Sequence, residues 1–227
     1  MHVVAAAVCP HPPLLVPEVA SGAAPELDDL RAACLTAIDT LATASSILVV
    51  GSGSDGAYDG AAGGSFGAYG APGVRVGTGP AVLPLSLAIG GWLLDQTKTA
   101  PLPRTYRAVP ADLAPGECAR LGQELAAGND SVGLLVMGDG SARRSEHSPV
   151  HLHPRAEIFD TTVANAFQRC DLDVLAALDP DLAAELQAAG RAPWQVLAGA
   201  LRGSELTGEL LYEAAPYGVG YFVASFS

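Results

Sequence analysis

Short apolar segments alternate with amphipathic helical patterns along most of this chain, and this alternation constrains the fold more than any other feature. Residues 3–8 are apolar, partly β-branched and followed by Pro10, which predicts a buried strand that stops abruptly. A helical pattern follows over residues 25–41, and residues 46–50 predict a second buried strand. A strand, a helix and a strand in this order indicate a parallel βαβ unit with a right-handed crossover.

The alternation continues towards the C-terminus, where residues 209–224 predict two antiparallel strands joined by a Pro-Tyr-Gly turn. We therefore expect one α/β domain over residues 1–227, with a three-layer αβα architecture, a largely parallel central sheet and an antiparallel C-terminal hairpin. The other predicted strands are residues 74–76, 104–109 and 131–137, and the other predicted helices are residues 85–97, 115–127, 154–170, 171–190 and 193–201.

Composition excludes several classes of partner. The 24 acidic and 12 basic residues give a formal net charge of -12, so we expect neither nucleic acid nor an anionic membrane surface as a partner. The four cysteines are widely spaced, and no basic residue precedes Arg31 in the apolar N-terminal segment. These features predict a reduced, cytoplasmic protein without a signal peptide. Residues 76–94 lack charge, but prolines interrupt them, so we expect a core helix there and no membrane span.

His11 is the first candidate site residue. Pro10 and Pro12 hold the backbone around it extended, so the imidazole lies on a stiff loop at the end of the first strand. Ligands of open α/β sheets bind at the carboxyl ends of the strands. The alternative is a tight turn that carries an incidental surface histidine.

Residues 51–73 contain nine glycines and are the most irregular part of the chain. One interpretation is a loop that cradles a phosphate through its backbone amides. The other is a long, flexible surface loop that lies over a pocket. The absence of a Gly-Lys-Ser/Thr motif favours the flexible loop.

Three further histidines, His147, His151 and His153, lie close together in the sequence. Pro149 argues against a regular helix through them, whereas an extended backbone would point His151 and His153 to the same side, as in a metal-binding pair. The segment is therefore either a relocated metal or substrate site or an exposed polar loop. The lack of acidic or cysteine ligands close by favours the polar loop.

Three motifs carry a resemblance to a known family. They are Pro-His-Pro-Pro-Leu-Leu-Val-Pro-Glu-Val at residues 10–19, Gly-Asp-Gly-Ser at residues 138–141, and Tyr-Glu-Ala-Ala-Pro-Tyr-Gly-Val-Gly-Tyr at residues 212–221. Together they resemble the class III extradiol ring-cleavage dioxygenase catalytic (B) subunit superfamily, which includes the Memo-like proteins. The resemblance implies that His11 and Glu213 are ligands of Fe(II) or another divalent metal. It also implies a homodimer.

The chain departs from this family at two positions. The family's second ligand histidine corresponds to the segment 51–55, where Asp55 is the substitute candidate, and Ala142 replaces the family's acid/base histidine. A two-histidine, one-carboxylate triad leaves open iron positions for substrate and dioxygen, and acid/base groups contribute about 10²- to 10⁴-fold to rate. These departures predict that the fold persists while standard aromatic ring cleavage is lost.

We therefore expect an extradiol dioxygenase-like protein that keeps part of a metal site, His11 and Glu213, and binds a small molecule or a protein without turnover. The candidate pocket residues are Asp55, His151, His153 and Tyr217. One alternative is an active metal-dependent oxidoreductase that cleaves a catechol-like substrate with substitute ligands, such as Asp55 or a loop histidine. Another is a hydrolase or other enzyme that uses Asp139, Ser141 and His147, whose spacing matches no recognised triad. The cofactor is Fe(II), another divalent metal, or none.

Overall fold

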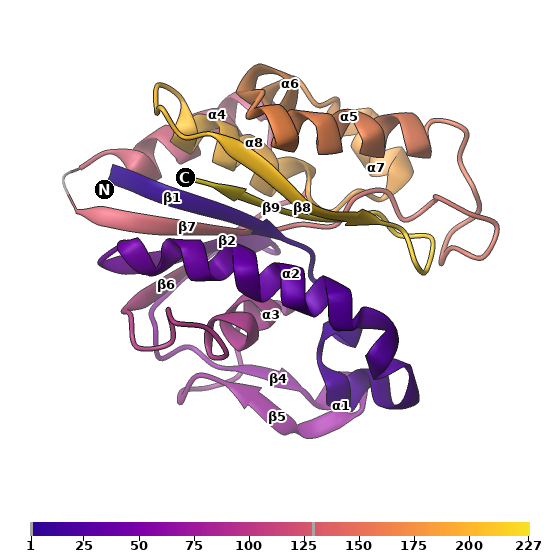
Figure 1. The fold of residues 1–227 in the computed structure, drawn as a ribbon, viewed down its shortest axis with the longest axis horizontal. Coiled ribbons are helices and arrows are strands. Elements are labelled where there is room, and N and C mark those ends of the chain that lie inside the picture. The colour runs from indigo at the N-terminus through magenta and orange to yellow at the C-terminus, as the bar shows by residue number, and fades with distance from the viewer. Residues whose placement is uncertain (1, 129) are drawn as a thin grey trace.

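The computed structural model describes residues 2–128 and 130–227. Its centre is a seven-stranded sheet in the order β3-β6-β2-β7-β1-β9-β8 (Figure 1). The pairs β1–β7, β2–β7 and β2–β6 are parallel, whereas β3, β9 and β8 pair antiparallel with their neighbours. The strands are β1 (His2–Cys9), β2 (Ser46–Ser52), β3 (Gly56–Tyr58), β6 (Arg104–Val109), β7 (Ser131–Met137), β8 (Gly208–Ala214) and β9 (Tyr221–Phe226).

Helices cover both faces of this sheet (Figure 1). We call the side of α2 and α3 the α2 face, and the side of α4 to α8 the α5 face. The α-helices are α1 (Pro17–Ala20), α2 (Asp28–Asp39), α3 (Leu85–Leu94), α4 (Pro115–Ala126), α5 (Ala156–Arg169), α6 (Leu172–Ala176), α7 (Pro180–Leu186) and α8 (Arg191–Leu201). Short 3₁₀ helices span Pro13–Leu15, Ser21–Leu27, Thr40–Thr43 and Gly67–Tyr69.

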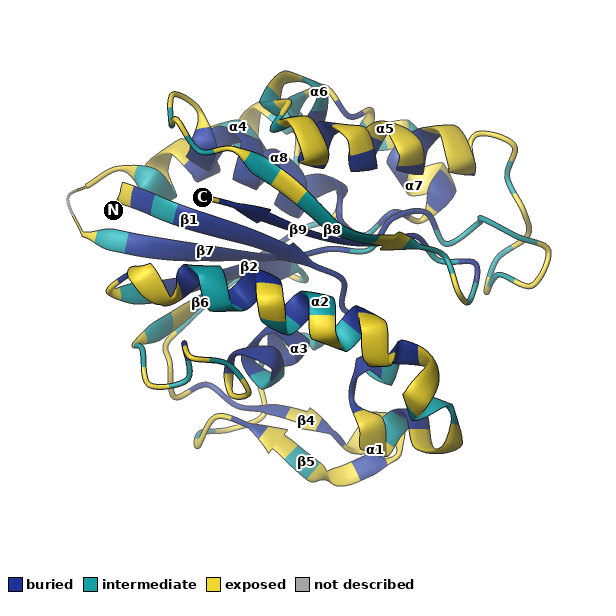
Figure 2. Ribbon diagram, in the orientation of Figure 1, coloured by how far each residue is buried: buried dark blue, intermediate teal, exposed yellow. Residues whose placement is uncertain are grey.

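Alternate residues of the central strands pack into two separate cores. In β1, Ala6 and Val8 pack on the α5 face, whereas Ala7 and Cys9 pack on the α2 face. Both sides of the central strands are therefore buried, which explains why their sequences are nearly continuous apolar runs (Figure 2). The predicted three-layer αβα architecture and the antiparallel hairpin of β8 and β9 are confirmed.

The glycine-rich segment differs from the flexible loop that the sequence favoured. It contains β3, the 3₁₀ helix Gly67–Tyr69, and a separate two-stranded sheet of β4 (Gly64–Phe66) and β5 (Ala71–Val76). The predicted strand at residues 74–76 belongs to this small sheet and not to the central one. Sequence periodicity identifies a strand but not its partner, because pairing depends on distant residues.

The other predicted elements agree closely with the observed ones. The bounds of β6 and β7 are as predicted. The predicted helix over residues 25–41 is α2 with a 3₁₀ turn at each end, and Pro25 lies in the first of these turns. The predicted helix over residues 171–190 is split into α6 and α7, and Pro180 begins the second. Among the described residues, no helix is long and apolar enough to cross a bilayer.

Two glycines allow α4 and α8 to approach closely. A Cβ atom on Gly122 of α4 would lie 2.6 Å from the backbone nitrogen of Ala200, and a Cβ atom on Gly199 of α8 would lie 2.8 Å from the Cα of Ala119. Real Cβ atoms do not approach backbone atoms this closely, so larger residues at these positions would force the helices apart.

This packing predicts that Gly122→Ala lowers the free energy of unfolding by about 1–3 kcal/mol, because the new methyl group overpacks the interface between α4 and α8. Gly116→Ala on the same helix is the control, since a Cβ atom there meets nothing within 4 Å. Its effect should be neutral or stabilising, by at most about 1 kcal/mol. Urea unfolding followed by circular dichroism measures both, and equal stabilities would contradict the close packing.

Candidate functional site

The candidate site lies where β1 and β7 end side by side. The two strands are parallel, with Cys9 opposite Met137. After this pair the chain leaves β1 towards the α2 face and leaves β7 towards the α5 face. The carboxyl ends of adjacent parallel strands with diverging connections are the usual binding position in open α/β sheets. His11 and Asp139 lie at this position.

A hydrogen bond fixes the relative position of His11 and Asp139. The backbone N–H of His11 donates to Asp139 Oδ1 at 2.7 Å, and the N–H of Gly138 donates to the carbonyl of Cys9 at 2.9 Å. Because Pro10 and Pro12 lack N–H groups, His11 supplies the donor in this part of the loop. The Asp139 carboxylate thus ties the loop after β1 to the loop after β7.

The imidazole of His11 is buried and incompletely hydrogen-bonded. Its side chain is 10% exposed, and Nδ1 has no hydrogen-bond partner among the described residues. Asp139 Oδ1 lies 3.6 Å from this Nδ1, which is beyond the range of a hydrogen bond. A buried polar atom without a partner costs free energy, so a water molecule or a ligand atom beside the two groups would be stabilising.

Tyr221 is a site residue that the sequence analysis did not select. The antiparallel pairing of β9 with β1, with Val8 opposite Ala224, brings the start of β9 towards the carboxyl end of β1. Tyr221 is 3% exposed, and burial, followed by the negative charge of Asp139, raises the pKa of its phenol. The hydroxyl therefore remains protonated and can donate a hydrogen bond. The Gly-Val-Gly-Tyr motif contains Tyr221, but the motif alone does not show that Tyr221 lies within range of the Asp139 charge.

A buried carboxylate supports the loop that carries Asp139. The Asp160 side chain is fully buried on α5, where Oδ1 accepts from the backbone N–H of Ser141 at 2.8 Å and Oδ2 pairs with Arg144 Nη1 at 2.9 Å. It lies against the backbone of Gly140 and Gly220, where side chains would collide with it. Burial raises the pKa of Asp160, the contacts with Ser141 and Arg144 oppose this, and the charge of Glu213 adds to the rise.

Ser141 and the three loop histidines take no part in the site around His11. The Ser141 hydroxyl is buried and donates to the carbonyl of Leu186 at 3.3 Å. His147 and His151 are exposed, in a segment between β7 and α5 that contains neither helix nor strand. His153 Nε2 lies 3.8 Å from Glu185 Oε2. The hydrolase arrangement of Asp139, Ser141 and His147 is therefore not brought together.

The structure does not bring Glu213 to His11. Glu213 is exposed on the edge strand β8 and lies directly opposite Phe222, which packs in the core of the α5 face. Tyr221, the next residue to Phe222, packs on the α2 face. The Glu213 carboxylate consequently lies on the side of Asp160, whose pKa it affects. A register shift in β8 between Leu210 and Tyr212 sets which residues face each side.

Asp55 and Tyr217 have other partners. Asp55 pairs with Arg107 of β6, with 2.8 Å between Oδ1 and Nη2. The Tyr217 hydroxyl donates to Glu26 Oε2 at 2.8 Å, and this bond joins the β8–β9 turn to the segment before α2. Among residues 2–128 and 130–227, no three His, Cys, Asp or Glu side chains gather to hold a metal. The donors do not fit a two-histidine, one-carboxylate triad, so the ligand role of His11 and Glu213 stays a prediction.

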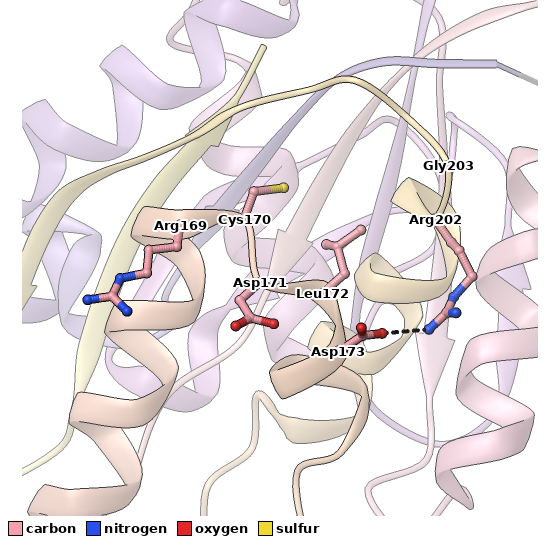
Figure 3. Close-up of a pocket in the computed structure, with 7 residues that line it drawn as sticks. All are labelled: Arg169, Cys170, Asp171, Leu172, Asp173, Arg202 and Gly203. Atoms are coloured by element: carbon pink, nitrogen blue, oxygen red, sulfur yellow. Dashed lines mark hydrogen bonds and ion pairs between the residues drawn. The ribbon is translucent and has the colours of Figure 1, made fainter.

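A cavity of about 420 Å³ between the end of α5 and the end of α8 lies away from His11 (Figure 3). Its wall at Gly203 also borders a cavity beside His2, at the amino end of β1. Arg202 pairs with Asp173 at 3.1 Å in this cavity, and Asp171 caps α6 by accepting from the N–H of Val174. These charged groups already have partners, and the cavity is separate from the candidate site.

Comparisons with known proteins establish the fold but no activity. No family model matches the chain. A segment of 95 residues, 42% of the chain, is 30% identical to "Protein CA_C1420" of Clostridium acetobutylicum, and the match spans only 20% of that protein's length. The uncharacterized protein JW3007 from Escherichia coli K12 superposes with a TM-score of 0.54 and 14% identity, over 98% of this chain and 99% of that one. At this identity the likeness shows a shared fold alone.

The burial of Asp160 predicts that Asp160→Ala lowers the free energy of unfolding by about 3–5 kcal/mol, because it leaves Arg144 without its partner and Ser141 without an acceptor. Asp173→Ala is the matched control, since Asp173 pairs with Arg202 on the surface, where such pairs contribute about 1 kcal/mol or less. Denaturant unfolding compares the two variants. A loss of similar size in both would show that Asp160 does not hold the loop.

The raised pKa of Asp160 also predicts a pH dependence. In the unfolded chain the Asp160 carboxyl titrates near pH 4, and the raised pKa means that the folded state binds the carboxyl proton more tightly. The protonated carboxyl therefore stabilises the folded state at low pH. This contribution is lost as pH rises from about 4 through the pKa of the folded state. Relative to Asp160→Asn, the free energy of unfolding of the wild type should fall by up to about 1.4 kcal/mol per pH unit in that window. Unfolding at a series of pH values measures the difference, and the opposite slope would mean that Arg144 outweighs burial.

Proposed function

We propose that this chain is an extradiol dioxygenase-like protein that binds a small molecule at His11 and does not carry out standard aromatic ring cleavage. The observation that carries the proposal is the buried Nδ1 of His11, which lacks a hydrogen-bond partner among the described residues and lies 3.6 Å from Asp139 Oδ1 at the carboxyl ends of β1 and β7. A ligand that reaches this position meets a hydrogen-bonding group that the protein itself leaves unpaired.

The polar groups around this position favour a ligand with hydroxyl or amine groups. The Asp139 carboxylate accepts hydrogen bonds, the imidazole of His11 can donate or accept, and Tyr221 keeps a protonated hydroxyl. A ligand hydroxyl can donate to Asp139 and accept from His11 at the same time. A catechol, which carries two adjacent hydroxyls, is therefore a suitable first probe.

Two features argue against the ring-cleavage chemistry that the resemblance implies. Ala142 cannot transfer a proton, although the corresponding histidine of the family is the acid/base group. The carboxylate expected as a metal ligand, Glu213, lies on the α5 face, and Asp55 is paired with Arg107. The chain thus lacks both an acid/base group and the expected metal donors, which supports a binding function without aromatic ring cleavage.

The second candidate is a metal-dependent oxidoreductase that uses a substitute ligand. The separation of 3.6 Å between His11 Nδ1 and Asp139 Oδ1 favours it, because two donors at this spacing can share one divalent cation. In this alternative Asp139, and not Asp55 or a loop histidine, supplies the second donor. Fe(II) and other divalent metals remain the cofactor candidates.

The cellular setting that we propose is a reduced cytoplasm. All four cysteines are free, and the thiols of Cys9, Cys34 and Cys118 are buried. A net charge of -12 supports a small-molecule ligand over nucleic acid or anionic membranes as the partner. Homodimerisation, which the resemblance implies, stays a prediction.

The test is catechol binding by isothermal titration calorimetry to the wild type, His11→Ala and the control His147→Ala, whose histidine is exposed. We expect His11→Ala to weaken binding about tenfold or more, since a hydrogen bond to a charged or polarised group is lost, and His147→Ala to bind as the wild type does. Equal binding by all three proteins would contradict the site assignment.

The same proteins distinguish the two candidates after anaerobic incubation with ferrous iron and desalting. We expect little retained iron by mass spectrometry and no oxygen uptake with catechol. Near-stoichiometric iron in the wild type that is lost in His11→Ala, together with oxygen uptake, would overturn the non-catalytic proposal and support the oxidoreductase.

A further inference from the structure

A further cavity, of about 400 Å³, is used by no part of the proposed function. Its lining includes Gly60 of the glycine-rich segment, Arg75 of β5, Gly77 and Thr78 directly after this strand, and Arg104 and Tyr106 of β6. Arg104 is the first residue of β6, so the cavity lies towards the amino ends of the parallel strands. His11 follows the carboxyl end of β1, so the two sites lie at opposite ends of the parallel strands.

Two glycines beside this cavity pack closely against neighbouring backbone. A Cβ atom on Gly60 would lie 2.7 Å from the carbonyl oxygen of Arg104, which leaves no room for a side chain. Gly77 has a φ of +66° and would place a Cβ atom against the carbonyl of Ala62. Glycine at these positions therefore lets the segments that line the cavity lie directly against neighbouring backbone.

The charges in the cavity leave one arginine unpaired. Arg104 Nη1 pairs with Asp95 Oδ1 at 2.7 Å, and Nη2 donates to the carbonyl of Ala100 at 2.8 Å. Asp95 also lines the cavity and neutralises this first arginine. Arg75 is exposed and takes part in no ion pair found among the described residues. The lining thus has a net charge of +1 in a protein with a net charge of -12.

Two hydroxyl groups add neutral donors to this positive charge. Tyr106 is buried, and burial raises the pKa of its phenol while Arg104 opposes the rise, so the hydroxyl stays protonated. Thr78 contributes a second hydroxyl to the lining. An arginine with free N–H groups beside hydroxyl donors matches the acceptor oxygens of a phosphate or a carboxylate.

We propose that this cavity is an oxyanion-binding site, which holds the phosphate or carboxylate group of a small molecule through Arg75 with Thr78 and Tyr106 as further donors. The site is independent of His11, so it can be present or absent whatever the function of the site at the carboxyl ends of β1 and β7. Attraction of an anion by a local positive charge in an acidic protein depends on ionic strength, which gives the site a measurable signature.

The experiment is a titration of the full chain with inorganic phosphate and, in a second arm, with acetate, followed through the arginine Nε–Hε signals in ¹H–¹⁵N spectra. The wild type, Arg75→Gln and Arg75→Lys are compared with Arg120→Gln, a control arginine that is exposed on α4. We expect saturable binding by the wild type and Arg120→Gln, and affinity about tenfold lower in Arg75→Gln. Arg75→Lys should recover part of the affinity, because it restores the charge without the forked donors.

Salt and ligand identity complete the test. Binding should weaken strongly towards about 1 M sodium chloride, where the Debye length falls to about 3 Å. Saturation by phosphate alone, or by acetate alone, identifies which oxyanion the site takes, and either supports the proposal. Shifts that do not saturate with either anion, or equal affinities in Arg75→Gln and Arg120→Gln, would overturn it, and circular dichroism verifies that every variant is folded.

Discussion

The buried carboxylate of Asp160 is the interaction on which the arrangement of the candidate site depends. It joins three segments that are far apart in the sequence: the loop after β7, helix α5 and the turn before β9. A charge in this position is stable only when hydrogen bonds and an ion pair replace its hydration, and Ser141 and Arg144 supply them. The backbone N–H of Gly140 also donates to the carbonyl of Gly220 at 2.7 Å, so the loop and the turn are held together around Asp160.

This arrangement gives two sequence motifs a structural role that the resemblance did not specify. Gly140 and Gly220 belong to the Gly-Asp-Gly-Ser and Gly-Val-Gly-Tyr motifs, and each meets Asp160 through bare backbone. Of the residues beside them in the same motifs, Asp139 lies near His11, and Tyr221 lies within range of the Asp139 charge. The motifs therefore combine support of the loop with presentation of polar groups at the candidate site.

Local sequence pattern predicts the elements well and the site only in part. The bounds of β6 and β7 follow from apolar runs, and the place of His11 at a strand end follows from the prolines beside it. The face of Glu213 depends on a register shift inside β8, and the position of Tyr221 depends on antiparallel pairing with β1. The sequence gives no sign that Asp160 is buried, because polar and apolar residues are interspersed along α5. These features result from contacts between distant segments, which a local pattern does not contain.

The central place of β1 in the sheet has a consequence for how the chain folds. His2 pairs with Ser131 in β7, and Ala6 pairs with Phe226 in β9, so the first strand has partners only in the second half of the sequence. During synthesis its apolar residues emerge long before these partners do. Such non-local pairing slows folding and leaves unpaired strand edges exposed in the meantime. We therefore expect nascent chains of this protein to depend on chaperones until β9 is available.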